Sequence, residues 1–302
     1  MRWSSSIART CCGRRIMRSW MNEPLKAHTT FQIGGPAEEL AAPESEEELL
    51  ALLARGPALV LGAGSNLLVG DAGVKGLTVL LGEAFSRVET EGDCVFAQAG
   101  ARLGQVAGLA MRAGLSGLEF AAGIPGSVGG AVAMNAGAYG GQISDVLEEA
   151  RVAMAGKIAI LSREDMEFGY RTSLPLREGL VVAGARFRLQ RDDPAAIAAR
   201  MAEFARRRRE KQPLSQPSAG SVFKRPEGHF AGALIEGAGL KGLRVGGAQV
   251  SEKHAGFIVN TGGATARDVL ALVERIRARV REEYGVELEL EIRVVADGEE
   301  RA

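Results

Sequence analysis

The sequence predicts an α+β protein in which short strands and helices alternate around a buried core. Three observations favour this class: apolar stretches of strand length recur, glycine-rich turns separate them, and helical patterns with capping residues stand between them. The chain has 302 residues, of which 46% are hydrophobic, so it is long enough for two domains or one large one. It should fold without disulfide bonds.

Charge and cysteine content exclude several classes of function. Lys and Arg number 37, as do Asp and Glu, so no net charge would draw the chain to nucleic acid or to a membrane surface. Cys11, Cys12 and Cys94 make no disulfide framework and fit a reducing compartment. No run approaches the roughly 18 apolar residues that span a bilayer. We expect a cytoplasmic protein, a monomer that needs no protein partner, with no nucleic-acid partner, no membrane insertion and no metal site.

Residues 1–20 differ from the rest of the chain. They contain five arginines and no acidic residue, as a transit peptide does, but they lack a clear amphipathic pattern. A start at Met17 or Met21 is an equally good interpretation. We expect an N-terminal extension over residues 1–20 that is disordered or not native.

The elements of the first half follow from their end signals. Ser45 and Glu48 form a capping box that predicts a helix to Leu53, ended by Gly56. Apolar runs and a small-residue pattern predict the next elements: strands at 58–61, 77–81 and 95–99, and a helix over 103–112 closed by Gly114.

Two glycine-rich turns stand out in this half. The run Gly62-Ala-Gly-Ser-Asn66 follows a strand, but the third glycine of a dinucleotide fingerprint would fall at Leu67, and no Walker A lysine follows either turn. The second turn lies within the stretch 119–141, in which seven of 23 residues are glycine. Such a turn can cradle phosphate oxygens, or it can be a surface loop or close helix packing; composition supports the two equally.

The second half contains two longer helices. Strands are predicted at 147–154, 157–161 and 180–189. Asp193 and Pro194 then open a helix to Arg209, whose basic end, 206–211, we interpret as a solvated helix end. Residues 218–226 form a packed turn, and a capping box at Thr265 opens a helix that Gly285 stops. Alternation predicts a closing strand over 286–295.

Six motifs, in order, resemble the UDP-N-acetylenolpyruvoylglucosamine reductase family in its shorter form, from about Lys26 to Val295. They are Gly62-Ala-Gly-Ser-Asn66, Gly123-Ile-Pro-Gly-Ser-Val-Gly-Gly130, Asn135-Ala-Gly137, Tyr170-Arg171, Ser218-Ala-Gly-Ser-Val-Phe-Lys224 and Gln249-Val-Ser-Glu-Lys-His254. The resemblance implies a two-lobed FAD-binding domain of the vanillyl-alcohol-oxidase type over 21–195 and a smaller α/β substrate-binding domain over 196–302.

The resemblance also implies the cofactor site. FAD would be bound without a covalent bond, and NADPH would supply the hydride. The implied cofactor-binding residues belong to the two turns and to the segment after them: Gly62, Ala63, Gly64, Ser65, Asn66, Gly123, Ile124, Pro125, Gly126, Ser127, Gly129, Gly130 and Asn135.

The implied reaction is reduction of UDP-N-acetylglucosamine enolpyruvate to UDP-N-acetylmuramate in peptidoglycan precursor synthesis. Ser221 would donate the proton, Arg171 would hold the substrate carboxylate, and Glu291 would polarise the substrate with it. Each has a plainer interpretation: a turn hydroxyl for Ser221, a surface ion pair for Arg171, and a solvated strand face that Glu291 shares with Glu287 and Glu289.

Four further residues would contact the substrate: Tyr170, Lys211, Lys224 and Lys253. Lys211 or Lys224 would stabilise the Ser221 anion, and His254 either lines the same cleft or is structural. Arg225 stands where the family commonly has Asn. Two other functions remain open: an FAD-dependent oxidase or dehydrogenase of the same fold acting on an alcohol or hydroxy acid, and a flavin- or nucleotide-binding module without activity.

Overall fold

The computed structural model describes residues 18–296 and 299–301, and it confirms the α+β prediction. The chain forms two compact units that interleave in sequence. The first contains the described residues up to Trp20, Leu40–Ala63 and Leu77–Arg208; the second contains Met21–Glu39, Gly64–Gly76 and the described residues from Arg209. This differs from a single boundary at residue 195, because two short N-terminal segments belong to the second unit. Residues 1–17 of the expected extension lie outside the described residues, and residues 18–20 begin strand β1 (Arg18–Pro24).

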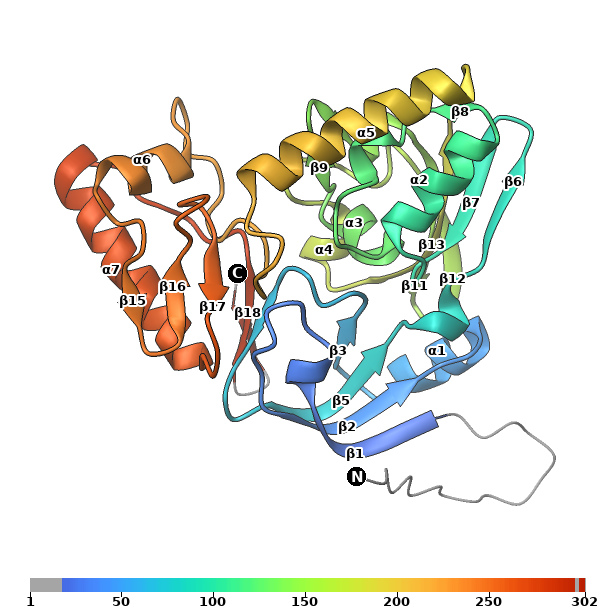
Figure 1. Cartoon of the computed structure of the whole chain (residues 1–302). Helices are drawn as coiled ribbons and strands as arrows, with labels where there is room; N and C mark the ends of the chain where they lie inside the picture. The colour runs from blue at the N-terminus through green and yellow to red at the C-terminus, as the bar shows by residue number, and fades with distance from the viewer. Residues whose placement is uncertain (1–17, 297–298, 302) are drawn as a thin grey trace. The chain divides into compact units, whose positions relative to one another are not determined.

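An antiparallel five-stranded sheet forms the centre of the first unit (Figure 1). Its strand order is β12 (Lys157–Ser162), β11 (Leu147–Met154), β13 (Val181–Arg188), β7 (Cys94–Gln98) and β6 (Val88–Glu91). Helices α2 (Leu103–Arg112) and α3 (Val128–Ala133) cover one face, where Val106, Val132 and Phe187 are fully buried. The predicted strands at 147–154 and 157–161 and the helix at 103–112 are confirmed.

The other face of this sheet packs on helix α1 (Glu46–Leu53). Ser45 caps α1 as predicted, because its side chain accepts a hydrogen bond from the N–H of Glu48 at 3.2 Å. Strand β3 (Ala58–Leu61) pairs in parallel with β5 (Val74–Leu80), in a sheet of order β1-β2-β5-β3 that includes β2 (Pro36–Ala42). Shorter elements complete the unit: η2 (Glu83–Phe85), β8 (Leu115–Ser116), η3 (Glu119–Ala121), β9 (Gly137–Ala138), β10 (Gly141–Gln142), η4 (Ile143–Asp145), α4 (Leu174–Arg177) and β14 (Gln190–Arg191).

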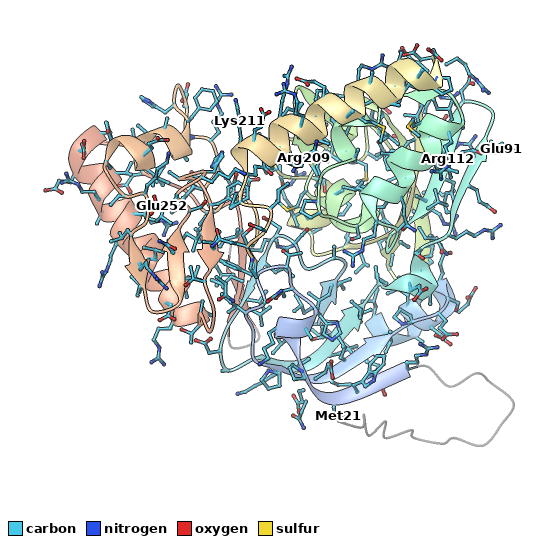
Figure 2. The ribbon with its side chains drawn as sticks, viewed as in Figure 1. Met21, Glu91, Arg112, Arg209, Lys211 and Glu252 are labelled. Carbon is cyan, nitrogen blue, oxygen red and sulfur yellow. The ribbon has the colours of Figure 1, made fainter. Side chains whose placement is uncertain are left out.

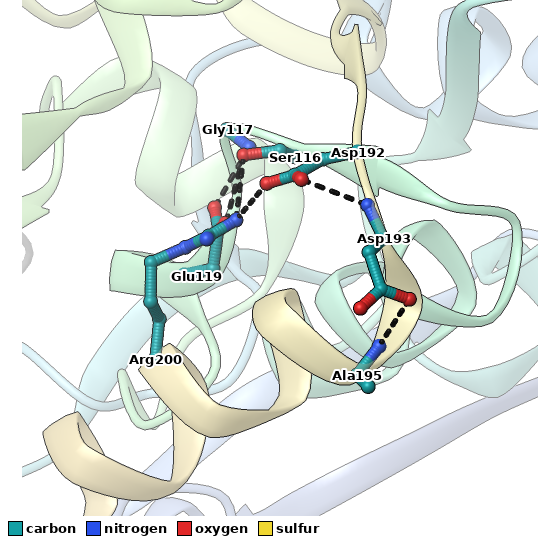
Figure 3. Close-up of polar contacts among 7 residues, drawn as sticks. All are labelled: Ser116, Gly117, Glu119, Asp192, Asp193, Ala195 and Arg200. Carbon is teal, nitrogen blue, oxygen red and sulfur yellow. Dashed lines mark hydrogen bonds and ion pairs between the residues drawn. The ribbon is translucent and has the colours of Figure 1, made fainter.

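Hydrogen bonds to carboxylates fix the first turns of helix α5 (Pro194–Lys211) within the first unit (Figure 3). Asp193 caps it as predicted, with a carboxylate oxygen accepting from the N–H of Ala195 at 3.2 Å. About two turns after Asp193, the Arg200 guanidinium donates to the carboxylate of Glu119 at 2.8 Å. Glu119 is only 8% exposed, and it also accepts from the N–H of Gly117. Because Glu119 opens the second glycine-rich turn, this contact holds the turn against α5.

The second unit packs helices α6 (Ala231–Gly237) and α7 (Ala266–Tyr284) on a sheet of order β15 (Arg244–Val245), β16 (Ala248–Val250) and β17 (Ile258–Asn260). It also contains η1 (Leu25–Ala27). The capping box at Thr265 is present, and Gly285 ends α7 in the left-handed conformation, as predicted. Val222 and Phe223 are buried in this core, so the prediction of a packed turn at 218–226 is confirmed.

The predicted closing strand over 286–295 is mostly wrong. Strand β18 spans Arg293–Ala296, and the preceding residues make a single bridge, Phe223 to Leu290. Strand β18 pairs in parallel with β4 (Leu67–Val69) and antiparallel with β19 (Glu299–Arg301). The in-and-out alternation of residues 286–292 is real, but without a continuous partner strand it makes no ladder. None of the helices in the described part of the chain is long and apolar enough to cross a membrane.

Candidate active site

The two glycine-rich turns meet in the first unit. Gly62 follows β3, and Ser127 precedes α3; a Cβ built on Gly62 would overlap the Oγ of Ser127. Ser127 is 3% exposed and bridges to Arg102, and the N–H of Leu103 donates to the carbonyl of Gly126 at 3.0 Å. Glycine at position 62 is therefore required by the close approach of the second turn.

The second turn uses several of its own N–H groups. Those of Val128 and Gly129 donate to the carbonyls of Ala101 and Ala99, both at 2.9 Å. A Cβ on Gly129 would lie 2.8 Å from the Cβ of Ala99, so this glycine is needed for packing. Close packing thus accounts for residues 128–129. The interpretation of the rest of the turn as a phosphate cradle stays a prediction.

Asn135 holds two loops of the first unit together. It is 3% exposed and has a positive φ of 45°. Its amide donates to the carbonyl of Gly169 at 3.1 Å, and its oxygen accepts from the N–H of Ser144 at 2.9 Å. Its side chain therefore fixes the turn that carries Tyr170 and Arg171.

Arg171 lies on a strained turn. Its φ is 57°, and Glu167 and Tyr139 nearby in the unit also have positive φ, at 44° and 53°. Such values are costly for residues other than glycine and gather at functional sites. The Arg171 guanidinium donates to the carbonyl of Gly137 at 3.3 Å and lies 5.3 Å from the ring centroid of Tyr170, which is 55% exposed. These contacts hold the guanidinium beside Gly137 and Tyr170, and the role of Arg171 in binding the substrate stays a prediction.

Arg208 was missed by the sequence analysis, which placed it in a solvated helix end. It is 9% exposed, and its Nε lies 2.7 Å from where a Cβ of Gly123 would be. Burial lowers the pKa of the guanidinium, while the Tyr139 hydroxyl partly offsets this effect. Tyr139 in turn stacks on Phe204, with ring centroids 4.8 Å apart. A cation and an aromatic ring therefore stand beside the Gly123 turn.

In the second unit, Gly64, Ser65 and Asn66 continue the first turn. Gly64 has a φ of +60°, and a Cβ there would overlap the carbonyl oxygen of His28. Its own carbonyl accepts from the N–H of Thr30 at 3.1 Å. The amide of Asn66 donates to the main-chain carbonyl of Glu291 at 2.9 Å. The turn is thus fixed to the segment that carries Glu291.

Ser221 and Glu291 lie on neighbouring chain segments of the second unit. The N–H of Glu291 donates to the carbonyl of Val222, the residue after Ser221, at 2.8 Å. The N–H of Val222 donates to Gly256 at 2.9 Å, and Ser221 bridges to Phe257. Two residues far apart in sequence are therefore brought together by main-chain hydrogen bonds.

In the structure, Glu291 has a different environment from Glu287 and Glu289, which share its place in the alternating pattern. Glu289 is exposed and pairs with Lys224 at 3.2 Å, and Glu287 is exposed and pairs with Arg281 at 2.9 Å. Glu291 is only partly exposed. Lys224 lies three residues after Ser221, and its main-chain N–H also donates to the carbonyl of Glu289.

The remaining candidates are exposed cations near the partly buried His254. Lys211 and Arg209 lie at the C-terminal end of α5 (Figure 2), and Lys253 donates to the carbonyl of Arg209. Burial lowers the pKa of His254, whose Nδ1 accepts from the N–H of Gly256 at 3.1 Å. His254 is therefore held neutral next to the Ser221 segment.

Two family models match the chain. Residues 212–295 match the C-terminal domain of UDP-N-acetylenolpyruvoylglucosamine reductase, and residues 37–159 match an FAD binding domain. These matches confirm the expected FAD-binding domain.

Curated relatives and one solved structure agree over almost the whole chain. UDP-N-acetylenolpyruvoylglucosamine reductases of Syntrophomonas wolfei and Caldanaerobacter subterraneus are each 49% identical, over 92% of this chain and 95% and 94% of their own. The crystal structure of UDP-N-acetylenolpyruvylglucosamine reductase from Thermus caldophilus has a TM-score of 0.81 and 44% identity, and the match covers 92% of this chain and 98% of that one.

Proposed function

The chain belongs to the UDP-N-acetylenolpyruvoylglucosamine reductase family, and on this premise we propose that it reduces UDP-N-acetylglucosamine enolpyruvate to UDP-N-acetylmuramate with NADPH and FAD. The reaction belongs to peptidoglycan precursor synthesis. The main observation that supports the proposed catalytic residues is the main-chain hydrogen bond between Glu291 and Val222, the residue after Ser221.

The residues of the first unit fit a cofactor that contains a diphosphate. The two glycine turns meet at Gly62 and Ser127, where the Oγ of Ser127 occupies the space that a Cβ on Gly62 would need. Gly130 is exposed, and a Cβ there would meet nothing closer than 3.7 Å. Glycine main chain beside a helix start suits phosphate oxygens. We assign FAD contacts to residues 62–65 and 123–130, and to Asn135 in the segment after them.

Bound FAD would supply the hydride, received from NADPH, that adds to the methylene carbon of the enolpyruvyl group. The substrate carbon that bears the carboxylate then carries negative charge and must receive a proton. The chain's own residues have to stabilise that charge and deliver that proton.

Ser221 is the proposed proton donor. A hydroxyl is a weak acid, but it can protonate a much more basic carbanion or enolate. Its segment is held on both sides, by Gly256 and by Glu291, so the hydroxyl is positioned without reorganisation during the reaction. Lys224, three residues later, is the nearer candidate in sequence to stabilise the serine anion; Lys211 is the alternative.

Arg171 and Glu291 are the proposed groups for the substrate carboxylate. The planar guanidinium of Arg171 suits two-point binding of a carboxylate. Glu291 would polarise the substrate together with Arg171. Tyr170, Lys211 and Lys253 are proposed to bind other parts of the substrate, because an exposed aromatic ring and exposed cations suit a nucleotide sugar with a diphosphate. We further propose that the protein acts in the cytoplasm, which its cysteine content supports, and that it acts as a monomer.

The absorption spectrum of the purified protein tests this function. We expect a flavin spectrum that NADPH bleaches and that the enolpyruvyl substrate restores without oxygen. Ser221→Ala should leave the bleaching intact and slow the restoration, because the hydroxyl acts after hydride has left the flavin. Bleaching by an alcohol or a hydroxy acid without NADPH would instead support the oxidase function.

A further inference from the structure

The side chain of Asn66 is hydrogen-bonded to the chain segment that carries Glu291. Its side-chain amide donates to the main-chain carbonyl of Glu291 at 2.9 Å. The main-chain carbonyl of Asn66 accepts from the N–H of Arg293, also at 2.9 Å. The next residues, Leu67–Val69, pair in parallel with Arg293 to Val295. Asn66 therefore lies where the cofactor turn joins this strand pair.

The main chain of Glu291 is held from two sides. Its N–H donates to Val222 at 2.8 Å, next to Ser221, and its carbonyl accepts from Asn66. Fixing both main-chain groups fixes the peptide planes on either side of the Cα, and so the direction in which the carboxylate leaves the chain. The regular pairing of β18 begins only at Arg293, so position 291 lacks the support of a strand ladder. The amide of Asn66 takes over that support.

We propose that Asn66 is a positioning residue that orients the catalytic carboxylate of Glu291, rather than a direct ligand of the cofactor. The inference rests on the function proposed above for Glu291. One turn would then do two things: its glycines approach the cofactor, and its last side chain fixes the group that acts on the substrate.

Asparagine suits position 66 because its side-chain amide can donate a hydrogen bond. An aspartate of the same shape has no N–H and, when ionised, would place a negative oxygen against the Glu291 carbonyl. Alanine would leave the carbonyl without this donor but would not repel it. Asn66→Asp should therefore disturb Glu291 more than Asn66→Ala does.

The test measures the two half-reactions separately by stopped flow, in the holoenzyme, for Asn66→Ala, Asn66→Asp, Glu291→Gln and the combined variants. Flavin content and the rate of flavin reduction by NADPH should stay within about twofold of the parent. Reoxidation by the enolpyruvyl substrate should slow at least about tenfold, since small displacements of a catalytic group cost that much. In the Glu291→Gln background, the Asn66 substitutions should add less than about twofold, because both act through one carboxylate.

Asp71→Asn is the matched control in the same 64–76 segment. Its carboxylate accepts from the N–H groups of Ala266 and Arg267, at 2.7 and 3.1 Å, at the start of α7. It should lower the melting temperature but leave both half-reactions unchanged. Loss of flavin from the Asn66 variants, slower reduction by NADPH, or effects that multiply with those of Glu291→Gln would overturn the inference. If Glu291→Gln alone leaves reoxidation unchanged, the proposed role of Glu291 fails, and the inference fails with it.

Discussion

At the scale of single residues, partners distinguish side chains that the sequence pattern makes equivalent. Glu287, Glu289 and Glu291 share one face of a period-two pattern, and nothing in that pattern selects one of them. In the structure, the first two are exposed and paired with Arg281 and Lys224. The N–H of Glu291 instead donates to the carbonyl of Val222, the residue after Ser221.

Glu291→Gln should therefore slow substrate reduction by about 10²-fold or more, with flavin content unchanged. Glu287→Gln is its matched control on the same face, since the exposed pair with Arg281 contributes little. Steady-state NADPH oxidation with the enolpyruvyl substrate measures both. Equal activity of the two variants would remove Glu291 from the mechanism.

Glu119 makes a pH-dependent contribution to stability. Burial raises its pKa, but hydrogen bonds from Arg200 and from the N–H of Gly117 outweigh that effect, so the pKa is lowered from 4.5. A lowered pKa in the folded state gives stability that is present above the ordinary value and lost as pH falls below it. Glu119→Gln should cost about 1.5–3 kcal/mol at neutral pH and less in acid.

Denaturant unfolding between pH 7 and pH 3 measures this difference. Glu203→Gln serves as the comparison, because Glu203 pairs with Arg206 and Arg207 on the exposed surface of the same helix α5. It should change stability little at pH 7. A cost for Glu119→Gln that does not shrink in acid would contradict the electrostatic account.

At the scale of elements, end signals predicted helices well because capping is local. The caps at Ser45, Asp193 and Thr265 are all present. The basic run of α5 was misinterpreted at one position, although the signal was in the sequence. Arg208 continues the 4-3-4 spacing of Ile197, Met201 and Phe204, so periodicity places it on the inward face.

The role of the glycine turns could not be predicted from the sequence, because their glycines are needed where segments distant in sequence come into contact. Gly62→Ala would drive a methyl group into Ser127, so we expect the turns to separate and flavin to be lost. Gly108→Ala, in the interior of α2, would make an ordinary contact at 3.5 Å and should stabilise the protein by about 0.5–1 kcal/mol. Flavin content after gel filtration, with melting temperature, compares the two. Full flavin retention by Gly62→Ala would show that the turns need not touch.

At the scale of the whole molecule, the sequence predicted the α+β class and the FAD-binding domain but not how the units interleave. A reader of the sequence assigns residues to domains by order along the chain. The second unit instead includes residues 21–39 and 64–76, because Phe31, Ile33 and Leu68 are buried in its core with α7. Asn260 secures this arrangement by donating to the carbonyl of Phe31 at 3.1 Å. Burial by residues distant in sequence leaves no local signal.

Phe31→Ala tests this assignment in the intact chain. Phe31 is fully buried, so its truncation should cost about 3–5 kcal/mol. We expect faster hydrogen exchange in α7 and in β16 and β17, with little change in β11 and β13. Phe85→Ala, which removes an equally buried ring from the core of the first unit, should give the opposite pattern. If Phe31→Ala loosened the five-stranded sheet and spared α7, residues 21–39 would belong with the first unit, and a single boundary near residue 195 would be the better description.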